Sequence, residues 1–310
     1  MEYISSFNKG FLASLKSNDT EEFIDIHFYR PLGYIWALFF KKIGATPNVI
    51  TIMSIFLGVG AGVCFYFNDI VINIIGVFLL IWANTYDSAD GQLARLTGQK
   101  SEIGRILDGA SGDLWFISIY IAICLRLMPS FIPFCNIKWG FIIWAVALWA
   151  GAYHTKQARL ADYYRNIHLF FLKGEDGSEL DNYNKQKEIF AQLKFKEHPL
   201  KTSFQFFYKN YTKEQEKATP NFQLFMVKLR EKYTDKIPVE IRRDFRQMSK
   251  PLMKWTNILT FNTRSIVMFI SILIGMPWIY FVFEIVILSF IYKYMQIAHE
   301  SICKYLLSKL

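Results

Sequence analysis

The chain has 310 residues, of which 53% are hydrophobic and 17% aromatic, and its formal net charge is +9. Long uncharged stretches in a sequence this apolar indicate a polytopic membrane protein. The four cysteines have neither paired nor metal-ligand spacing, which argues against a disulfide framework and against a zinc site.

The first expected element is an amphipathic helix over residues 18–42. Asp19 and Glu22 form a capping pattern at its start, and apolar residues then recur at helical spacing. We interpret this segment as a helix that lies along the cytoplasmic membrane surface and is interrupted near Pro31. An ordinary amphipathic helix packed into a core is the alternative interpretation.

Six apolar segments follow, and each is close to the roughly twenty residues that a bilayer requires. Gly58, Gly60 and Gly62 in the first of them indicate close helix packing and not a nucleotide-binding loop, because no strand precedes them. The predicted fold class is an all-α integral membrane protein with six transmembrane helices, an amino-terminal amphipathic interfacial helix and a helical cytoplasmic insertion. The six segments are residues 49–67, 70–95, 104–128, 138–160, 256–275 and 277–298.

We expect four parts along the chain. Residues 1–48 form an amino-terminal cytoplasmic segment, residues 49–162 hold the first four transmembrane helices, residues 163–255 form the insertion, and residues 256–310 hold the last two transmembrane helices and the tail. Most basic residues fall on one side of the apolar segments, so the positive-inside rule places that side in the cytoplasm. Within the insertion, periodic apolar residues predict amphipathic helices at residues 222–233 and 238–248.

A cluster of acidic residues lies where the second and third apolar segments meet water. Asp87 and Asp90 are one helical turn apart, and Asp108 and Asp113 follow on the next predicted helix. Carboxylates crowded in this way repel one another unless cations hold them. Oxygen-only ligands suit hard cations, so the cluster predicts a site for Mg²⁺ or Mn²⁺.

The residues that follow the first acidic pair suit a phosphate ligand. Gly91 and Ala94 leave room for a ligand to approach the backbone, and the guanidinium of Arg95 matches the geometry of phosphate. We therefore expect a site at the edge of the membrane that holds a divalent metal and a phosphate ligand.

The spacing of these residues resembles a known family signature. Asp-x-x-Asp-Gly-x-x-Ala-Arg, eight residues, Gly, three residues and Asp match residues 87–108 without a gap. This pattern is similar to that of the CDP-alcohol phosphotransferases, integral membrane enzymes of phospholipid synthesis. The family pattern continues with three residues and a fourth Asp, but this chain has Gly112 there and Asp113 one residue later. We predict that a π-bulge brings Asp113 into the missing place, and a site that works without it is the alternative.

The resemblance implies a role for each residue of the signature. The acids would hold two divalent ions, Asp113 would be the catalytic base, and the remaining residues would bind the CDP moiety of a CDP-linked lipid. The implied metal ligands are Asp87, Asp90, Asp108 and Asp113, and the implied CDP-binding residues are Asp87, Asp90, Gly91, Ala94, Arg95 and Gly104.

Three cations predict a second anion site, for the acceptor. Lys156 and Arg159 share a helix face at the end of the fourth apolar segment, and Arg264 lies at comparable depth in the fifth. The stretch around Lys156 is similar to that of family members with phosphorylated acceptors, such as phosphatidylinositol phosphate synthases, although Gln157 departs from their pattern. Membrane anchoring by snorkelling side chains is the alternative. Glu284 in the sixth segment is interpreted as a hydrogen-bond partner of a Ser or Tyr on another helix.

The predicted function is transfer of a phosphatidyl group from a CDP-linked lipid, first of all CDP-diacylglycerol, to the hydroxyl of a polar alcohol, with release of CMP. Inositol phosphate is the preferred acceptor. The alternatives are a CDP-choline or CDP-ethanolamine phosphotransferase, a phosphatidylglycerol phosphate synthase, or an inactive membrane homologue. A transporter is disfavoured because no inverted repeat is visible. The family suggests a homodimer in the lipid bilayer with its active site facing the cytoplasm, and we expect no nucleic-acid partner.

Overall fold

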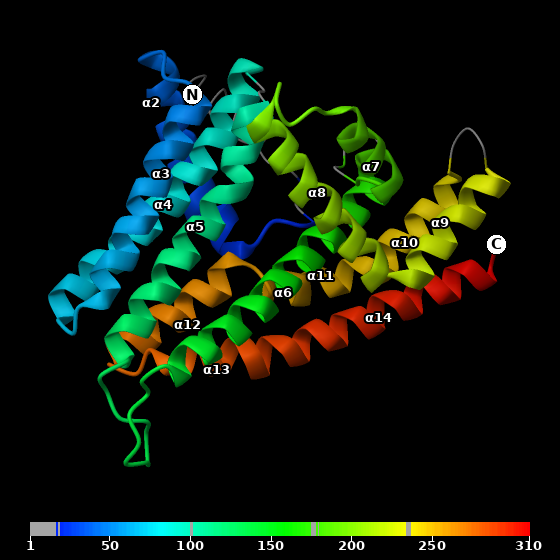
Figure 1. Cartoon of the computed structure of the whole chain (residues 1–310). Helices are drawn as coiled ribbons and strands as arrows, with labels where there is room; N and C mark the ends of the chain where they lie inside the picture. Colours follow the sequence, from blue (N-terminus) through cyan, green and yellow to red (C-terminus); the bar gives the residue numbers. More distant parts are fainter. Residues whose placement is uncertain (1–16, 18, 100–101, 175–177, 179, 234–236) are drawn as a thin grey trace. The chain divides into compact units, whose positions relative to one another are not determined.

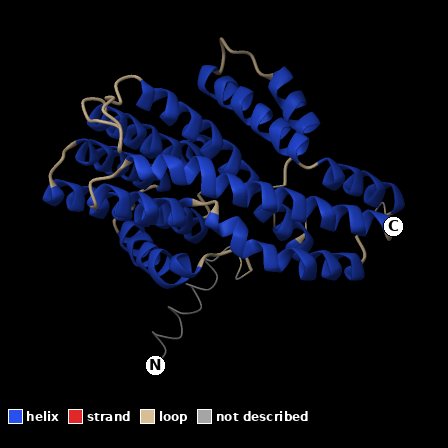
Figure 2. Cartoon of the chain, turned by 90° about the horizontal axis from the view of Figure 1, so that it is seen from below, coloured by secondary structure: helices blue, strands red, loops and turns tan. Residues whose placement is uncertain are grey.

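The computed structural model describes residues 17, 19–99, 102–174, 178, 180–233 and 237–310. Within these residues every regular element is helical, and the one strand-like feature is an isolated bridge between Phe131 and Lys138 (Figure 2). The all-α fold class is therefore confirmed. The chain divides into two compact units: residues 1–151 with 264–283 form the first, and residues 152–263 with 284–310 form the second.

The first unit contains the amino-terminal helices and the carboxylate motif. Its helices begin and end where the sequence demands: Pro47 occupies the first turn of one, the side chain of Asp69 accepts a hydrogen bond from the amide of Ile72 at the start of the next, and Gly98 ends that helix with a φ of 68°. In chain order they are η1 (Asp25–Tyr29), α2 (Arg30–Lys42), α3 (Pro47–Tyr66), α4 (Ile70–Thr97), α5 (Glu102–Leu127), the first turns of α6 (Ile142–Lys173), most of α12 (Phe261–Leu273), and α13 (Trp278–Val282) (Figure 1).

Two glycines bring α3 close to α5. A Cβ atom added at Gly58 would lie 2.1 Å from the side chain of Trp115, and one added at Gly62 would lie 2.2 Å from Oγ of Ser118. At Gly60 the added atom would make only an ordinary contact, 3.7 Å from a leucine on α4. The prediction of close helix packing is therefore confirmed most clearly at Gly58 and Gly62, where any side chain would hold the two helices apart.

Five stretches of the described chain are long and apolar enough to cross a membrane, and their outward-facing apolar side chains, such as Phe56 and Phe78, are 74% and 65% exposed. An integral membrane protein fits both observations. The predicted fourth segment lies mostly in α6, which is not among the five because polar residues from Tyr153 to Gln157 lower its hydropathy, so the count of six is not confirmed. The five stretches are Pro47–Tyr66, Ile70–Thr97, Ile106–Leu127, Val239–Leu273 and Trp278–Ser308.

Helix α2 packs against α4 through its apolar face. Ala37 and Phe40 of α2 form a buried cluster with Tyr86 and Leu93 of α4. The predicted interruption near Pro31 is wrong, because α2 runs through this residue without a break. The helical turns continue from η1 into α2, where the amide of Arg30 donates to the backbone oxygen of Asp25, five residues back. The irregular element is instead the π turn η1, directly before α2.

The second unit contains the insertion and the last helix. Two of its helices confirm the amphipathic helices predicted at residues 222–233 and 238–248 to within two residues. The division of the chain into four functional parts stays a prediction. The elements are most of α6, then α7 (Tyr183–Gln192), α8 (Pro199–Ala218), α9 (Pro220–Lys232), α10 (Val239–Ser249), η3 (Lys250–Leu252), α11 (Met253–Ile258), η4 (Phe283–Leu288) and α14 (Ser289–Ser308).

The second unit is held together by buried polar and aromatic contacts. The carboxylate of Glu300 on α14 accepts hydrogen bonds from the backbone amides of Asn221 (2.6 Å) and Phe222 (3.4 Å), so it caps the amino end of α9. The rings of Phe171 on α6 and Phe245 on α10 stack with their centroids 3.9 Å apart. These contacts fix α9 and α10 against the longer helices of the same unit.

Candidate active site

Three aspartates of the first unit, Asp87, Asp90 and Asp108, bring their side chains together and are called here the Asp group. One carboxylate oxygen from each lies within 4.8 Å of one from each of the others. Asp90 is buried, with 3% of its surface exposed, whereas Asp87 is half-buried and Asp108 is exposed. The group therefore extends from the interior of the unit to its surface, which leaves it open to a ligand.

The donor set of the Asp group fits a hard divalent cation. Three carboxylates this close repel one another, and at the edge of a membrane little water is present to screen the repulsion. A cation between them would relieve it, and carboxylate oxygens are the ligands that Mg²⁺ and Mn²⁺ prefer. The structure thus brings together three of the four predicted metal ligands, and the identity of the metal stays a prediction.

Two hydroxyl groups donate to the Asp group, and neither was predicted from the sequence. Thr51 Oγ1 donates a short hydrogen bond to Asp90 Oδ2, and Ser111 Oγ donates to Asp87 Oδ1 over 2.9 Å. A hydrogen bond to one carboxylate oxygen fixes the direction in which the other oxygen points. Thr51 follows the helix-entry proline by one turn, and Ser111 follows Asp108 by three residues, so spacing within each helix is the signal that would have found them.

The residues predicted to bind CDP lie on the same two helices as the Asp group. Gly91, Ala94 and Arg95 follow Asp90 on α4, and Gly104 precedes the third acid on α5. A Cβ atom added at Gly91 would lie 3.5 Å from Nη1 of Arg95, so the guanidinium folds back over the helix surface at this glycine. A cation suited to phosphate therefore lies beside Asp90. Binding of CDP by these residues stays a prediction.

Asp113 lies on α5 but outside the Asp group. Its side chain is exposed, and α5 is an ordinary α-helix throughout Glu102–Leu127, without the predicted π-bulge. Five residues along a regular helix rotate a side chain by roughly 140° from the starting face. Cβ atoms added at Gly109 or Gly112 would meet no atom within 4 Å, so nothing on that side crowds the backbone out of regular geometry. The role of Asp113 as metal ligand and base stays a prediction.

The amino-terminal helices pack on the part of α4 that carries the first two acids. Gln92 Nε2 donates to the backbone oxygen of Arg30 over 3.1 Å, and a Cβ atom added at Gly33 would lie 2.9 Å from Oγ of Ser88. Burial raises the pKa of Tyr29 to about 12, although a side-chain hydrogen bond with Asn84 of α4 acts in the opposite direction. Since Ser88 lies between the first two acids and Gln92 lies two residues after the second, these contacts restrain the helix that positions the Asp group.

Comparison with known proteins identifies the segment that carries the Asp group. Residues 45–167 match the family model described as CDP-alcohol phosphatidyltransferase. This segment is a CDP-alcohol phosphatidyltransferase domain. A protein of Aquifex aeolicus (strain VF5), itself named only as uncharacterized, is 42% identical to the chain over 82 residues, which are 26% of this chain and 40% of that protein. No solved structure matches the chain.

The phosphatidyltransferase domain contains two of the three predicted acceptor-binding cations. Lys156 and Arg159 lie on the part of α6 that belongs to the second unit, where their side chains lie 5.6 Å from the ring of Tyr153 and 5.1 Å from the ring of Tyr211. Arg264 lies outside the domain, on the part of α12 that belongs to the first unit, and is 1% exposed. A common acceptor site formed by these three cations stays a prediction.

The buried Glu284 has a partner that the sequence analysis did not name. Its Oε1 lies 3.3 Å from Nδ1 of His154 on α6, whereas we expected a Ser or Tyr. Gln157, the residue that departs from the family pattern, donates from Nε2 to the backbone oxygen of Glu284 over 3.0 Å and lies 3.1 Å from Oγ of Ser289. The π turn η4 bears that carbonyl oxygen. Gln157 therefore links α6 to η4 and to the start of α14 within the second unit.

Proposed function

We propose that the protein transfers a phosphatidyl group from CDP-diacylglycerol to the hydroxyl of a polar alcohol and releases CMP. The observation that carries this proposal is the Asp group, three carboxylates within 4.8 Å of one another in a CDP-alcohol phosphatidyltransferase domain. A pyrophosphate is a dense negative charge, and acids bind it only through cations. The Asp group supports that arrangement.

The Asp group and the residues around it would each have a different role in binding the CDP-linked lipid. Asp87, Asp90 and Asp108 would hold two divalent ions, which supply charge stabilisation to the pyrophosphate and to the departing CMP. Thr51 and Ser111 keep two of these carboxylates oriented by donating hydrogen bonds to them. Arg95 offers its guanidinium to a phosphate of the nucleotide. Gly91 and Ala94, together with Gly104 on the next helix, let the nucleotide approach the backbone.

The reaction also requires a proton acceptor. The acceptor oxygen forms a bond to the phosphorus of the phosphatidyl group, the bond from that phosphorus to the CMP oxygen breaks, and the hydroxyl proton passes to a base. We assign this base to Asp113, whose exposed carboxylate lies on the same helix as Asp108.

The acceptor that we propose carries a phosphate of its own. Lys156, Arg159 and Arg264 support an anionic acceptor, because the first two are cations at the end of the fourth apolar segment and the third lies one or two turns into the fifth. Inositol phosphate is the first choice and glycerol phosphate the second. We expect the active site to face the cytoplasm, the side on which basic residues concentrate, and the enzyme to act as a homodimer in the bilayer.

The test is acceptor-dependent release of CMP. Full-length protein purified in mixed lipid and detergent micelles is given CDP-diacylglycerol and Mn²⁺, with a panel of free and phosphorylated alcohols. We expect CMP only with a phosphorylated polyol, and at least about a hundredfold less with Asp113→Asn, since a positioned general base contributes roughly 10²–10⁴-fold.

Each other outcome removes a stated part of the proposal. Full CMP release by Asp113→Asn would discard this residue as the base and leave the transferase. CMP release with CDP-choline in place of CDP-diacylglycerol would show that the donor is the water-soluble substrate and that the acceptor is the lipid. Binding of CDP-diacylglycerol without CMP release from any acceptor would identify a homologue that has lost activity, as the glycine at position 112 would suggest.

A further inference from the structure

A helix of the insertion contacts one of the three cations that support an anionic acceptor. Arg159 lies on α6, inside the phosphatidyltransferase domain of residues 45–167, whereas α8 lies outside that domain. Both belong to the second unit. The central carbon of the Arg159 guanidinium lies 5.1 Å from the centroid of the Tyr211 ring on α8. A part of the chain that the domain does not include therefore contacts a residue proposed to bind substrate.

The ring of Tyr211 is itself attached to α6. Its hydroxyl donates to Asp162 Oδ2 over 3.0 Å, and Asp162 follows Arg159 by three residues on the same helix. Residues three apart share a helix face, so Tyr211 contacts one face of α6 at two points. The hydrogen bond to Asp162 therefore restricts where the ring, and with it the guanidinium of Arg159, can lie.

A second contact from α8 is made to the backbone of Arg159. Gln215 Nε2 donates to the backbone oxygen of Arg159 over 3.2 Å, and Gln215 follows Tyr211 by four residues on α8. Gln215 is only 5% exposed, so this hydrogen bond is shielded from water. Helix α8 thus holds both the main chain and the side chain of Arg159.

These contacts hold the guanidinium without using its hydrogen-bond donors. An aromatic ring attracts a cation through its charge, so the N–H groups stay available for a phosphate. Among the described residues, the buried Nε of Arg159 has no hydrogen-bond partner. Glu214 of α8 lies close enough for its charge to interact with Arg159, but it pairs with Lys217 over 3.0 Å. Arg159 is therefore both positioned and able to donate to a ligand.

Holding an arginine in place raises its affinity for phosphate. A long side chain loses rotational freedom when it binds a ligand, and one that is already held loses less. We propose, on the basis of the phosphorylated acceptor of the proposed function, that α8 positions the guanidinium of Arg159 for the acceptor phosphate. Tyr211 is a positioning residue in this arrangement, because it acts on the substrate through Arg159. The insertion thereby takes part in the choice of acceptor.

The test measures the affinity of the protein for the phosphorylated acceptor. Full-length protein in neutral detergent is titrated with inositol phosphate by isothermal titration calorimetry, and kcat and KM for CMP release are measured alongside. We expect Tyr211→Leu to raise Kd and KM about twofold to fivefold, the effect of one lost cation–π contact, and to leave kcat within about twofold of its wild-type value. Tyr211→Phe keeps the ring and should recover most of the affinity. An unchanged Kd in Tyr211→Leu would overturn the proposal.

A double-mutant cycle shows whether Tyr211 acts through Arg159. Arg159→Gln should raise Kd at least about tenfold, since it removes a charge-assisted contact to phosphate. In that background Tyr211→Leu should change Kd no further, because the ring has no cation left to hold. A loss of affinity as large as the one in the wild-type background would show that Tyr211 acts in another way, and the positioning role would be wrong.

A matched control removes an aromatic ring from elsewhere on α8. Phe207 is 70% exposed, and Phe207→Leu should leave the Kd for inositol phosphate at its wild-type value. Equal weakening in this control would show that the loss of any ring on α8 has the same effect, and would overturn the proposal. Should Tyr211→Leu not fold, Gln215→Met removes the hydrogen bond to the backbone of Arg159 and is expected to raise Kd about twofold. No change there would count equally against the positioning role.

Two further outcomes separate the role of Tyr211 from the transfer reaction. Wild-type protein that binds inositol phosphate with the expected dependence on Tyr211 but releases no CMP would keep the positioning role and overturn the transfer. CMP release from free alcohols, without binding of inositol phosphate, would keep the transfer and overturn the positioning role.

Discussion

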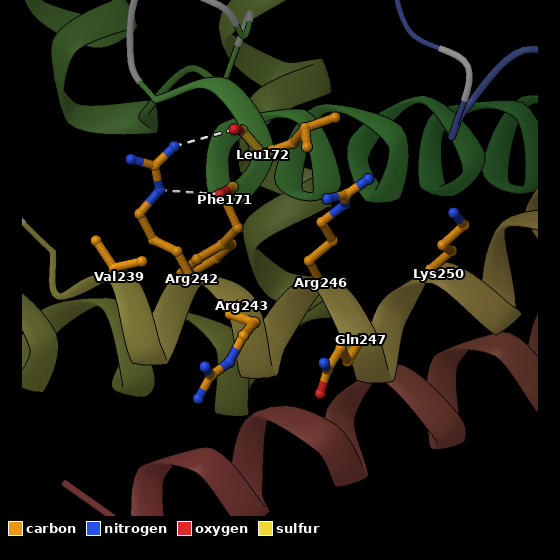
Figure 3. Close-up of a pocket in the computed structure, with 8 residues that line it drawn as sticks. All are labelled: Phe171, Leu172, Val239, Arg242, Arg243, Arg246, Gln247 and Lys250. Carbon is orange, nitrogen blue, oxygen red and sulfur yellow. Dashed lines mark hydrogen bonds between the residues drawn. The ribbon is translucent and has the colours of Figure 1, made fainter.

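The first unit gathers acidic side chains at one place, the Asp group, whereas the second gathers basic side chains on α10 and the start of η3. The Asp group places three carboxylates within 4.8 Å of one another, and four cations, Arg242, Arg243, Arg246 and Lys250, are among the described residues that line a cavity between α10 and the carboxyl end of α6 (Figure 3). In the proposed function the Asp group would bind phosphate through divalent ions, so a chelator should abolish binding there, whereas the interactions of exposed cations should weaken as salt is added.

The units also differ in how they are packed. Glycines let the backbones of α3 and α5 approach each other in the first unit, while in the second a buried carboxylate caps a helix and aromatic rings stack. Small residues suit helices that pack within lipid. Lipid is itself apolar, so an apolar side chain gains no hydrophobic free energy when it moves from lipid into a contact between helices. Helix caps and stacked aromatic rings are typical of the packing in a domain that also contacts water.

The largest expected effect concerns the Asp group, the acidic site of this comparison. Asp108→Asn should lower Mn²⁺-dependent CMP release on the order of 10³-fold, because it removes a charged oxygen from the proposed metal site. The change should also weaken Mn²⁺ binding, which electron paramagnetic resonance measures without any turnover. Asp69→Asn is the control, since it removes a carboxylate from the same unit and Asn still caps α4. Unchanged Mn²⁺ binding in Asp108→Asn would remove the metal assignment.

A smaller expected effect concerns the close packing of α3 on α5 in the first unit. Gly58→Ala should destabilise the first unit by about 1–3 kcal/mol, because the new methyl would lie 2.1 Å from the Trp115 ring and force α3 away from α5. Thermal unfolding in detergent, followed by tryptophan fluorescence, measures the loss. Gly60→Ala, two residues away, places its methyl at an ordinary 3.7 Å and should change little. Equal effects of the two changes would mean that this approach of α3 and α5 does not limit stability.

The smallest expected effect concerns the cap in the second unit. Glu300→Ala should cost roughly 1 kcal/mol, because it leaves the amides of Asn221 and Phe222 at the start of α9 without their acceptor. Hydrogen exchange of those amides should speed up and report the loss locally. Glu231→Ala, which removes an exposed acid from the end of the same helix, should leave that exchange unchanged. Slow exchange in Glu300→Ala would show that another group can cap α9.

Much of the fold and part of the site could be predicted from spacing along the helices. Asp87 and Asp90 lie one turn apart whatever surrounds them, and the amphipathic patterns of α9 and α10 are properties of their own sequences. Asp113 shows where this reasoning fails. Its role depended on a π-bulge, and the choice between a bulge and a regular turn is made by the contacts of the whole helix, which the local sequence does not contain.

The sequence by itself determined that the chain is helical and apolar, that three acids recur at the spacing of a phosphatidyltransferase, and that a basic helix precedes an apolar stretch. Only the tertiary structure decided which side chains meet: Thr51 with Asp90, Glu284 with His154, and Arg242 with the last carbonyls of α6. The reason is the range of the interactions. Helical periodicity acts over three or four residues, whereas these partners are dozens of residues apart and meet only when packing fixes the rotation of each helix.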